Sequence, residues 1–325
     1  MFLLEKNHKI FVAGHNGMVG SAIVRALESQ GYSNILTKNR SYLDLLSQSQ
    51  VEEFIFHEKP DVVIDCAAKV GGIHSNNIYR ADFIYSNLQI QNNLIHYSHK
   101  HGVKKLLFLG SSCIYPKFTD QPIKEEYLLR SPLEATNEPY ALAKIAGIKM
   151  CESYHKQYGS NFLSVMPCNQ YGPNDNYHLE NSHVLPALIR KFHEAVINDK
   201  KELQVWGTGR AKREFLHVDD LADACVFILQ DIDASHVYDL NISHLNIGSG
   251  TDISIHDLAY LLAEITGYTG NIKFELDKPD GTLEKLMSSK RINMMGWKPK
   301  ISLIDGIKNT YEDFKNKYPE NIRSF

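Results

Sequence analysis

The sequence predicts an α/β protein in which a doubly wound parallel sheet is followed by a smaller α/β C-terminal domain. Short runs of strand-forming residues alternate with helical patterns from residue 9 to residue 166, as in a parallel sheet with crossover helices. A glycine-rich turn follows the first run. The run at residues 61–66 is apolar on both faces, which suits a buried parallel strand.

The first unit is a strand, a glycine turn and a helix. A run at residues 9–13 leads into Gly14, Gly17 and Gly20, and a helical pattern follows at residues 21–28. Backbone amides and a helix N-terminus can receive a pyrophosphate in such a unit. The spacing is GxxGxxG rather than the commoner GxGxxG, and a simple tight loop is the alternative. The position directly after the first strand favours nucleotide binding.

A second strand is predicted at residues 34–38. About 20 residues past the last glycine of such a turn, an NAD-binding fold places an acidic residue for the ribose hydroxyls. This chain has Lys38 and Arg40 there instead, and a basic residue favours the 2′-phosphate of NADP. The alternative is a solvated loop arginine, with Asp44 close by.

Further strands are predicted at residues 61–66, 105–110 and 161–166, with long helices at residues 81–101 and from Tyr140 onwards. Ligands of doubly wound sheets bind at the carboxyl ends of the strands. We therefore expect Ser111, Cys113 and the Tyr140 helix to converge at that edge.

Tyr140 and Lys144 lie four residues apart, so a helix brings them together on one face. A nearby cation lowers the pKa of a tyrosine, ordinarily about 10, by about one to three units. The pair is therefore a candidate proton donor to a carbonyl. Tyr311 and Lys315 repeat the spacing but lack the neighbouring motifs, and we predict a surface helix there.

In the second half of the chain, strands and helices no longer alternate regularly. A helix is predicted at residues 181–198 and a strand at residues 204–207. We predict a nucleotide-binding domain at residues 1–172, to which a segment at about residues 214–232 returns, and a substrate domain at residues 173–325.

Composition narrows the class of protein. The net charge of −3 argues against a nucleic-acid surface, and no run approaches the about 18 apolar residues of a membrane span. The five cysteines are scattered without CxxC spacing. That pattern predicts free thiols in a reducing cytoplasm and no metal site.

Several blocks carry a specific resemblance. They are GHNGMVGSA (14–22), AAKVGGI (67–73), GSSCIYPK (110–117), NEPYALAK (137–144), NSHV (181–184) and REFLHVDD (213–220). The sheet, the serine after the fourth strand and the Tyr-x-x-x-Lys helix resemble the extended short-chain dehydrogenase/reductase superfamily, whose nucleotide-binding domain is a Rossmann fold. The blocks together resemble the GDP-L-fucose synthase family.

The resemblance implies an enzyme that epimerises C3 and C5 of a GDP-4-keto-6-deoxy sugar and reduces its C4 ketone with NADPH. Cys113 and His183 match the family's pair for exchanging protons at the carbons beside the ketone. A thiol and an imidazole, with ordinary pKa values of about 8.5 and 6.5, suit that exchange near neutral pH. Tyr140 would protonate the C4 oxygen beside a charged Lys144, and Ser111 would hydrogen-bond that oxygen. Buried, inert roles for Cys113 and His183 are the alternatives.

The resemblance also implies the binding residues. Those for the cofactor are Gly14, Asn16, Gly17, Met18, Val19, Gly20, Arg40, Leu109, Gly110, Lys144, Pro167, Asn169 and His183. Those for the sugar nucleotide are Lys191, Trp206, Arg213 and Asp280. The chain departs from the family at Asn16, commonly Arg, at Cys168 and Gln170, and at Leu283-Glu284, more often Pro-Arg. These departures put the exact sugar in doubt.

Other functions stay open at this point. One is reduction of C4 alone in a GDP-4-keto-6-deoxy-heptose of a capsule or surface-polysaccharide pathway. A second is a non-catalytic dinucleotide-binding regulator, which would be expected to lose Tyr140 or Lys144. By resemblance the protein is a homodimer paired through its two long first-domain helices.

Overall fold

The computed structural model describes residues 2–179, 181–278, 280 and 282–324, without the side chains of residues 73 and 74. Its largest layer is a six-stranded sheet with the strand order β2-β1-β3-β4-β5-β9, and all of its pairings are parallel. The strands are β1 Ile10–Ala13, β2 Ile35–Leu36, β3 Val62–Asp65, β4 Lys105–Leu109, β5 Phe162–Pro167 and β9 Leu245–Ile247. The predicted doubly wound parallel sheet is confirmed.

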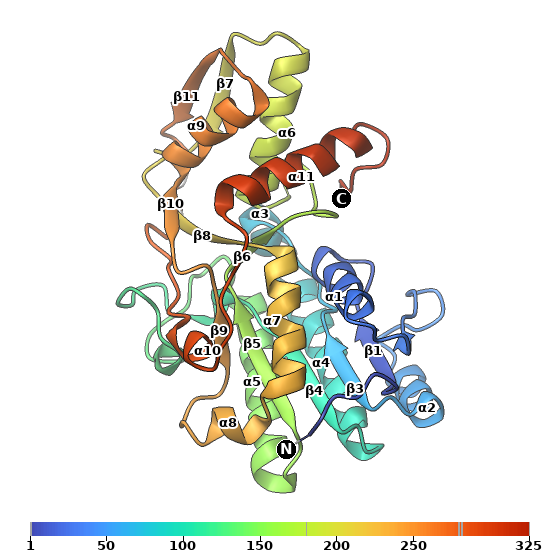
Figure 1. Cartoon of the computed structure of the whole chain (residues 1–325). Helices are drawn as coiled ribbons and strands as arrows, with labels where there is room; N and C mark the ends of the chain where they lie inside the picture. Colours follow the sequence, from blue (N-terminus) through green and yellow to red (C-terminus); the bar gives the residue numbers. More distant parts are fainter. Residues whose placement is uncertain (1, 180, 279, 281, 325) are drawn as a thin grey trace.

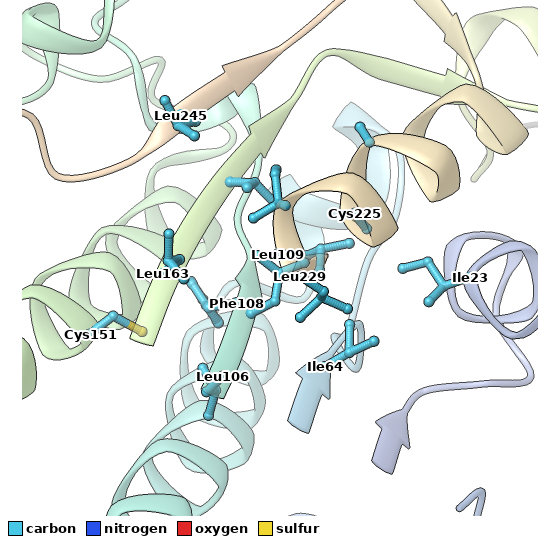
Figure 2. Packing of buried hydrophobic residues seen from close by; sticks show 14 of the residues in the cluster. Ile23, Ile64, Leu106, Phe108, Leu109, Cys151, Leu163, Cys225, Leu229 and Leu245 are labelled. Atoms are coloured by element: carbon cyan, nitrogen blue, oxygen red, sulfur yellow. The ribbon is translucent and has the colours of Figure 1, made fainter. Parts of the chain in front are cut away.

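Helices cover both faces of this sheet (Figure 1). On one face α4 packs beside α5, with α2 against α4, and on the other α1 packs against α7. Their bounds are α1 Met18–Ser29, α2 Gln48–Glu58, α4 Arg80–Lys100, α5 Glu138–Tyr158 and α7 Val218–Asp231; the short helices are α3 Ile73–Ile78 and α8 Ala234–Tyr238. Figure 2 shows the core, where Cys225 and Leu229 of α7 lie over the sheet near Leu109.

A second, smaller layer lies at the carboxyl edge of the large sheet (Figure 1). It holds a three-stranded sheet, β10-β8-β6, and a two-stranded sheet, β11-β7. The short helix α10 Lys290–Met294 packs against β9 of the large sheet. The strands of the smaller layer are β6 Asn169–Tyr171, β7 Glu202–Trp206, β8 Lys212–His217, β10 Asp252–Ser254 and β11 Asn271–Glu275, and its helices are α6 Val184–Ile197, α9 Ile255–Thr266 and α11 Leu303–Lys317. A separate apolar cluster that includes Phe192, Leu262 and Phe314 holds it together.

The chain crosses between the two layers more than once. After β6 enters the smaller layer, α7 returns to the large sheet, and β9 then adds its edge strand beside β5. The helix α7 lies over the predicted returning segment and packs against α1, while the division into domains stays a prediction. The edge strand β9 is an element that the sequence analysis did not identify.

The predicted surface helix at Tyr311 and Lys315 is wrong for the tyrosine. Tyr311 lies in the second apolar cluster with 6% of its surface exposed. Its hydroxyl lies 3.1 Å from His193 Nδ1, and the Lys315 ammonium lies 5.0 Å from its ring centroid. The face of α11 that carries Tyr311 and Phe314 packs against the smaller layer, so this pair has a structural role.

Candidate active site

The glycine turn lies at the switch point between β1 and β3, where a doubly wound sheet binds its ligand. Gly14 has a left-handed φ of +80°, and a Cβ there would come within 2.8 Å of the Ala67 nitrogen. A Cβ at Gly20 would collide with the Gly14 carbonyl. Only glycine therefore allows this close approach of α1 to the turn. Met18 and Val19 form the first turn of α1, whose backbone amides have no acceptor within the helix.

Asn16 and Arg40 lie on the exposed side of this turn. The Asn16 amide donates to Asn39 Oδ1 at 2.7 Å, so residue 16 is tied to the loop that carries Arg40. The Arg40 side chain is 80% exposed and has a loose ion pair, 3.8 Å, with Asp44. A pair this exposed adds little stability, so the guanidinium can turn towards an anion at little cost.

Tyr140 and Ser111 meet as predicted at the carboxyl end of β4. Tyr140 is 8% exposed, and Ser111 and Cys113 are both close enough to influence the pKa of its phenol. Burial raises the pKa of Tyr140 above its ordinary value. The predicted lowering by Lys144 is therefore wrong for the protein without ligand, because desolvation outweighs any effect of the cation.

Lys144 is directed at the sheet rather than at the phenol. Its ammonium donates to the Leu109 carbonyl at 2.8 Å and lies 4.7 Å from the centroid of the Phe108 ring. Burial lowers its pKa, while Asp65 acts in the opposite direction. A proton lost at alkaline pH is thus expected to come from Lys144 before Tyr140.

Cys113 sits in a short turn directly after Ser111, and its backbone amide donates to Ser111 Oγ at 3.3 Å. The Lys285 ammonium lies 3.8 Å from Cys113 Sγ. Both line a cavity of about 40 Å³ together with Lys117 and Asn137. A larger hollow of about 460 Å³ beside Met287 contains none of the candidate residues.

His183 is the N-cap residue of α6 and keeps an exposed surface. The protein around its ring nevertheless lowers its pKa by desolvation, and the charge of Lys285 adds to that effect. Lys285 therefore links Cys113 and His183. Lys285 directly follows Leu283-Glu284, where the chain departs from the family, and its position close to both proton-exchange candidates could not be read from spacing.

The remaining cofactor candidates cluster at the ends of β4 and β5. Gly110 donates to the Val165 carbonyl at 2.8 Å, Pro167 ends β5, and the Asn169 amide donates to the Glu214 carbonyl at 2.9 Å. Leu109 supplies the carbonyl that binds Lys144. These residues therefore lie on the edge that carries Ser111.

The sugar-nucleotide candidates come from the smaller layer. The Lys191 ammonium lies 5.2 Å from the Trp206 ring centroid, and Trp206 is 46% exposed. Arg213 donates to the carbonyls of Thr282 and Asp280 at 2.6 and 3.0 Å, and Cys113 is close enough to influence the pKa of its guanidinium. Arg213 thus joins this group to the catalytic candidates.

The carboxylate of Asp280 accepts hydrogen bonds from within the protein. It accepts from the Thr208 amide and hydroxyl, each at 2.7 Å. In this state the carboxylate fixes the turn after β7, where Gly207 has a φ of +83°. Residues 279 and 281, on either side of Asp280 in the sequence, lie outside the described residues.

Among the described residues, no group of three or more His, Cys, Asp or Glu side chains is placed to hold a metal ion. Within the same ranges, the helices are too short or too polar to cross a membrane.

The chain is similar to known proteins over nearly its whole length. The model of the NAD dependent epimerase/dehydratase family matches residues 10–248. GDP-L-fucose synthase 1 of Arabidopsis thaliana is 58% identical over 308 residues, 95% of this chain and 93% of that protein. GDP-L-fucose synthase of Escherichia coli strain K12 is 51% identical over 310 residues, 94% of this chain and 96% of that protein.

A solved structure extends the comparison to three dimensions. MlghC, a GDP-mannoheptose C4 reductase from Campylobacter jejuni with NADP bound, is 41% identical with a TM-score of 0.88, covering 96% of this chain and 99% of that one. The chain belongs to the GDP-L-fucose synthase family, within the NAD dependent epimerase/dehydratase family.

Proposed function

We propose that the protein reduces the C4 ketone of a GDP-4-keto-6-deoxy sugar with NADPH and epimerises C3 and C5 of the same sugar, as in GDP-L-fucose synthesis. The observation that carries the proposal is the meeting of Ser111, Cys113 and Tyr140 at the carboxyl edge of the large sheet, with Lys285 next to Cys113 and close enough to influence the pKa of His183. The sequence similarity to GDP-L-fucose synthases supports it.

The glycine turn fits a dinucleotide. Gly14 and Gly20 have no Cβ, so the backbone of the turn packs closely against neighbouring backbone, as in a dinucleotide-binding turn. When bound, NADPH supplies the hydride for the C4 carbon. The backbone amides of the turn would hold the pyrophosphate, and Lys144 would hold the ribose. Ser111 would orient the ketone, and Tyr140 would donate its proton to the C4 oxygen as charge develops there.

Epimerisation needs a base on one face of each carbon and an acid on the other. The protons at C3 and C5 are acidic because both carbons flank the ketone. Cys113 and His183 would exchange those protons, and Lys285 would stabilise negative charge at the sulfur. A lowered pKa keeps His183 neutral near pH 7, so that it can take up a proton.

The smaller layer would bind the GDP group. Lys191 and Arg213 supply cations for the two phosphates, and the exposed face of Trp206 supplies a wall for the guanine. We further propose the division into domains at residues 1–172 and 173–325, with residues 214–232 returning to the first, and a cytoplasmic location. A homodimer through α4 and α5 fits their adjacent packing and the exposed Tyr85 and Leu142 side chains.

The wild-type protein tests the function directly. It is incubated in deuterated water, without a partner epimerase, with NADPH and either a GDP-4-keto-6-deoxy-hexose or the corresponding heptose. NADPH oxidation with deuterium at C3 and C5 supports the bifunctional reaction. Oxidation without deuterium at either carbon would remove the epimerase half, and no oxidation with any keto sugar would remove the whole proposal.

A second candidate is reduction of C4 alone in a GDP-4-keto-6-deoxy-heptose. The similarity to a GDP-mannoheptose C4 reductase favours it, as do the departures at Leu283 and Glu284 beside the candidate site. The same incubation separates the two candidates, because reduction of C4 alone consumes NADPH with the heptose and leaves no deuterium at C3 or C5.

Replacing Arg40 with Ala is expected to weaken NADPH binding by about 10- to 100-fold, since a hydrogen bond to a charged group contributes about 1.5–3 kcal/mol. NADH, which lacks the 2′-phosphate, should lose less than about twofold. Fluorescence titration with both cofactors measures this. Lys38→Ala in the same exposed loop is the control, and equal losses for the two cofactors would contradict the assignment.

A further inference from the structure

An acidic side chain ends a strand that is otherwise wholly apolar. Val62, Val63 and Ile64 of β3 are fully buried, and so is Asp65 after them. A carboxylate is costly to bury unless a charge or hydrogen bonds compensate it. One oxygen, Oδ1, accepts from the Ala67 amide at 3.1 Å. The other, Oδ2, is buried without a hydrogen-bond partner in the described part of the chain.

The sheet register shows which way Asp65 faces. Asp65 pairs with Phe108, and Phe108 pairs with Ser164, so these three side chains lie in one row on one face of the sheet. The Phe108 ring lies against α5, since a Cβ at Gly147 would meet it, and the Lys144 ammonium lies over it. Asp65 therefore faces the helix that carries Tyr140 and Lys144.

Lys144 has one hydrogen-bond acceptor in the described residues, the Leu109 carbonyl, and an ammonium has three protons to donate. The groups that act on Asp65 are few. Lys144 of α5 acts on Asp65, and Asp65 in turn acts on Cys151 of α5 and on Cys66, which directly follows β3 and is influenced by Cys225 of α7. Gln91 of α4 is neutral and donates to the Ala143 carbonyl. Lys144 is the single cation among them.

We propose, on the basis of the function proposed above, that Asp65 is the buried counter-ion of Lys144 and a positioning residue for the reduction step. The carboxylate keeps the ammonium charged inside the core, where it can hold the cofactor ribose and stabilise negative charge as Tyr140 gives up its proton. Without Asp65, the burial that already disfavours the charged lysine acts unopposed.

The pKa shifts of Asp65 and Lys144 show that each group favours the charged form of the other. Burial raises the pKa of Asp65 to about 6, and Lys144 draws it down. Burial lowers the pKa of Lys144, and Asp65 draws it up. With a pKa of about 6, Asp65 is mostly charged at pH 7 and so favours the charged form of Lys144. Because burial raises the pKa of Tyr140, the alkaline limb of the reduction rate is assigned to Lys144.

The first experiment is the pH profile of kcat for NADPH oxidation in Asp65→Asn, which keeps the shape of the side chain. Its alkaline limb is expected about one unit or more below that of the wild type, a tenfold change in proton affinity, while KM for the GDP-sugar stays within twofold. Ser164→Ala, in the same row, is the matched control and should keep the wild-type profile. An unchanged limb in Asp65→Asn would overturn the proposal.

The second experiment needs no activity and so separates this inference from the proposed function. The unfolding midpoint is measured from pH 4 to pH 8 for the wild type and Asp65→Asn. A pKa raised from 3.8 to about 6 makes Asp65 favour the folded state most at low pH, and this contribution is lost as pH rises through 6. The difference between the two proteins should therefore titrate near pH 6.

The same comparison is then made between Lys144→Met and the double variant with Asp65→Asn. Loss of the ammonium should move the titration to higher pH, because Lys144 draws the Asp65 pKa down. A titration at the same pH in both backgrounds, or a difference that is flat from pH 4 to pH 8, would show that the two groups do not form a pair. Failure of all keto sugars in the activity assay would instead remove the proposed function.

Discussion

Replacing Tyr140 with Phe is expected to lower kcat for NADPH oxidation by about 10²- to 10⁴-fold, the usual contribution of a positioned general acid. The substitution removes only the phenolic oxygen that interacts with Ser111, and the ring keeps its edge contact with Phe83. The fold and the affinity for NADPH should therefore change little. Stopped-flow oxidation of NADPH with a saturating keto sugar measures the chemical step.

The chain contains a matched control for this experiment. Tyr311 has a lysine at the same spacing and is also buried, but it lies in the cluster of the smaller layer. Tyr311→Phe should retain full activity and lose only the stability of its contact with His193. Wild-type rates in Tyr140→Phe would show that another group protonates the C4 oxygen.

Cys113→Ala is expected to reduce deuterium incorporation at C3 and C5 by at least about 100-fold, because the exchange loses its thiol. Reduction of a ketone that is already epimerised should continue within severalfold, since Ser111, Tyr140 and Lys144 are untouched. Mass spectrometry of the sugar nucleotide measures incorporation, and NADPH absorbance measures reduction in the same reaction.

Two further variants test whether the loss of deuterium incorporation is specific to the Cys113 thiol and its neighbour Lys285. Lys285→Met keeps the thiol but removes the ammonium 3.8 Å from its sulfur, so incorporation should fall to a level between wild type and Cys113→Ala. Cys225→Ala, at a buried cysteine of α7, should leave incorporation unchanged. If Cys113→Ala exchanges deuterium at the wild-type rate, the proton carrier is a different residue.

Local patterns in the sequence were sufficient for much of the fold. The strand, glycine turn and helix from Ile10 to Ser29 and the long helix that carries Tyr140 follow from periodicity and punctuation over short windows. The three-residue strand β9 was missed because it has no such pattern of its own. It is a strand only because β5 offers it a parallel edge.

The candidate site was predictable as a set of residues but not as an electrostatic environment. Spacing placed Tyr140 and Lys144 on one helix face, yet it carried no information on burial, which reverses the expected pKa shift of the phenol. Asp65 looked like part of an apolar run, and Lys285 follows a segment that departs from the family and was not singled out. Their importance depends on electrostatic interactions with residues about 80 and 170 positions away along the chain, which only the folded chain brings together.

The repeated crossing between the two layers has a consequence for how the protein folds. A chain that ended at residue 172 would lack α7 and β9, so Ile23, Leu109 and their neighbours would lose their cover (Figure 2). The large sheet is complete only after residue 247 has joined it. Such long-range pairing slows folding. Because the chain crosses between them, we expect the large sheet and the smaller layer to unfold together as one cooperative unit.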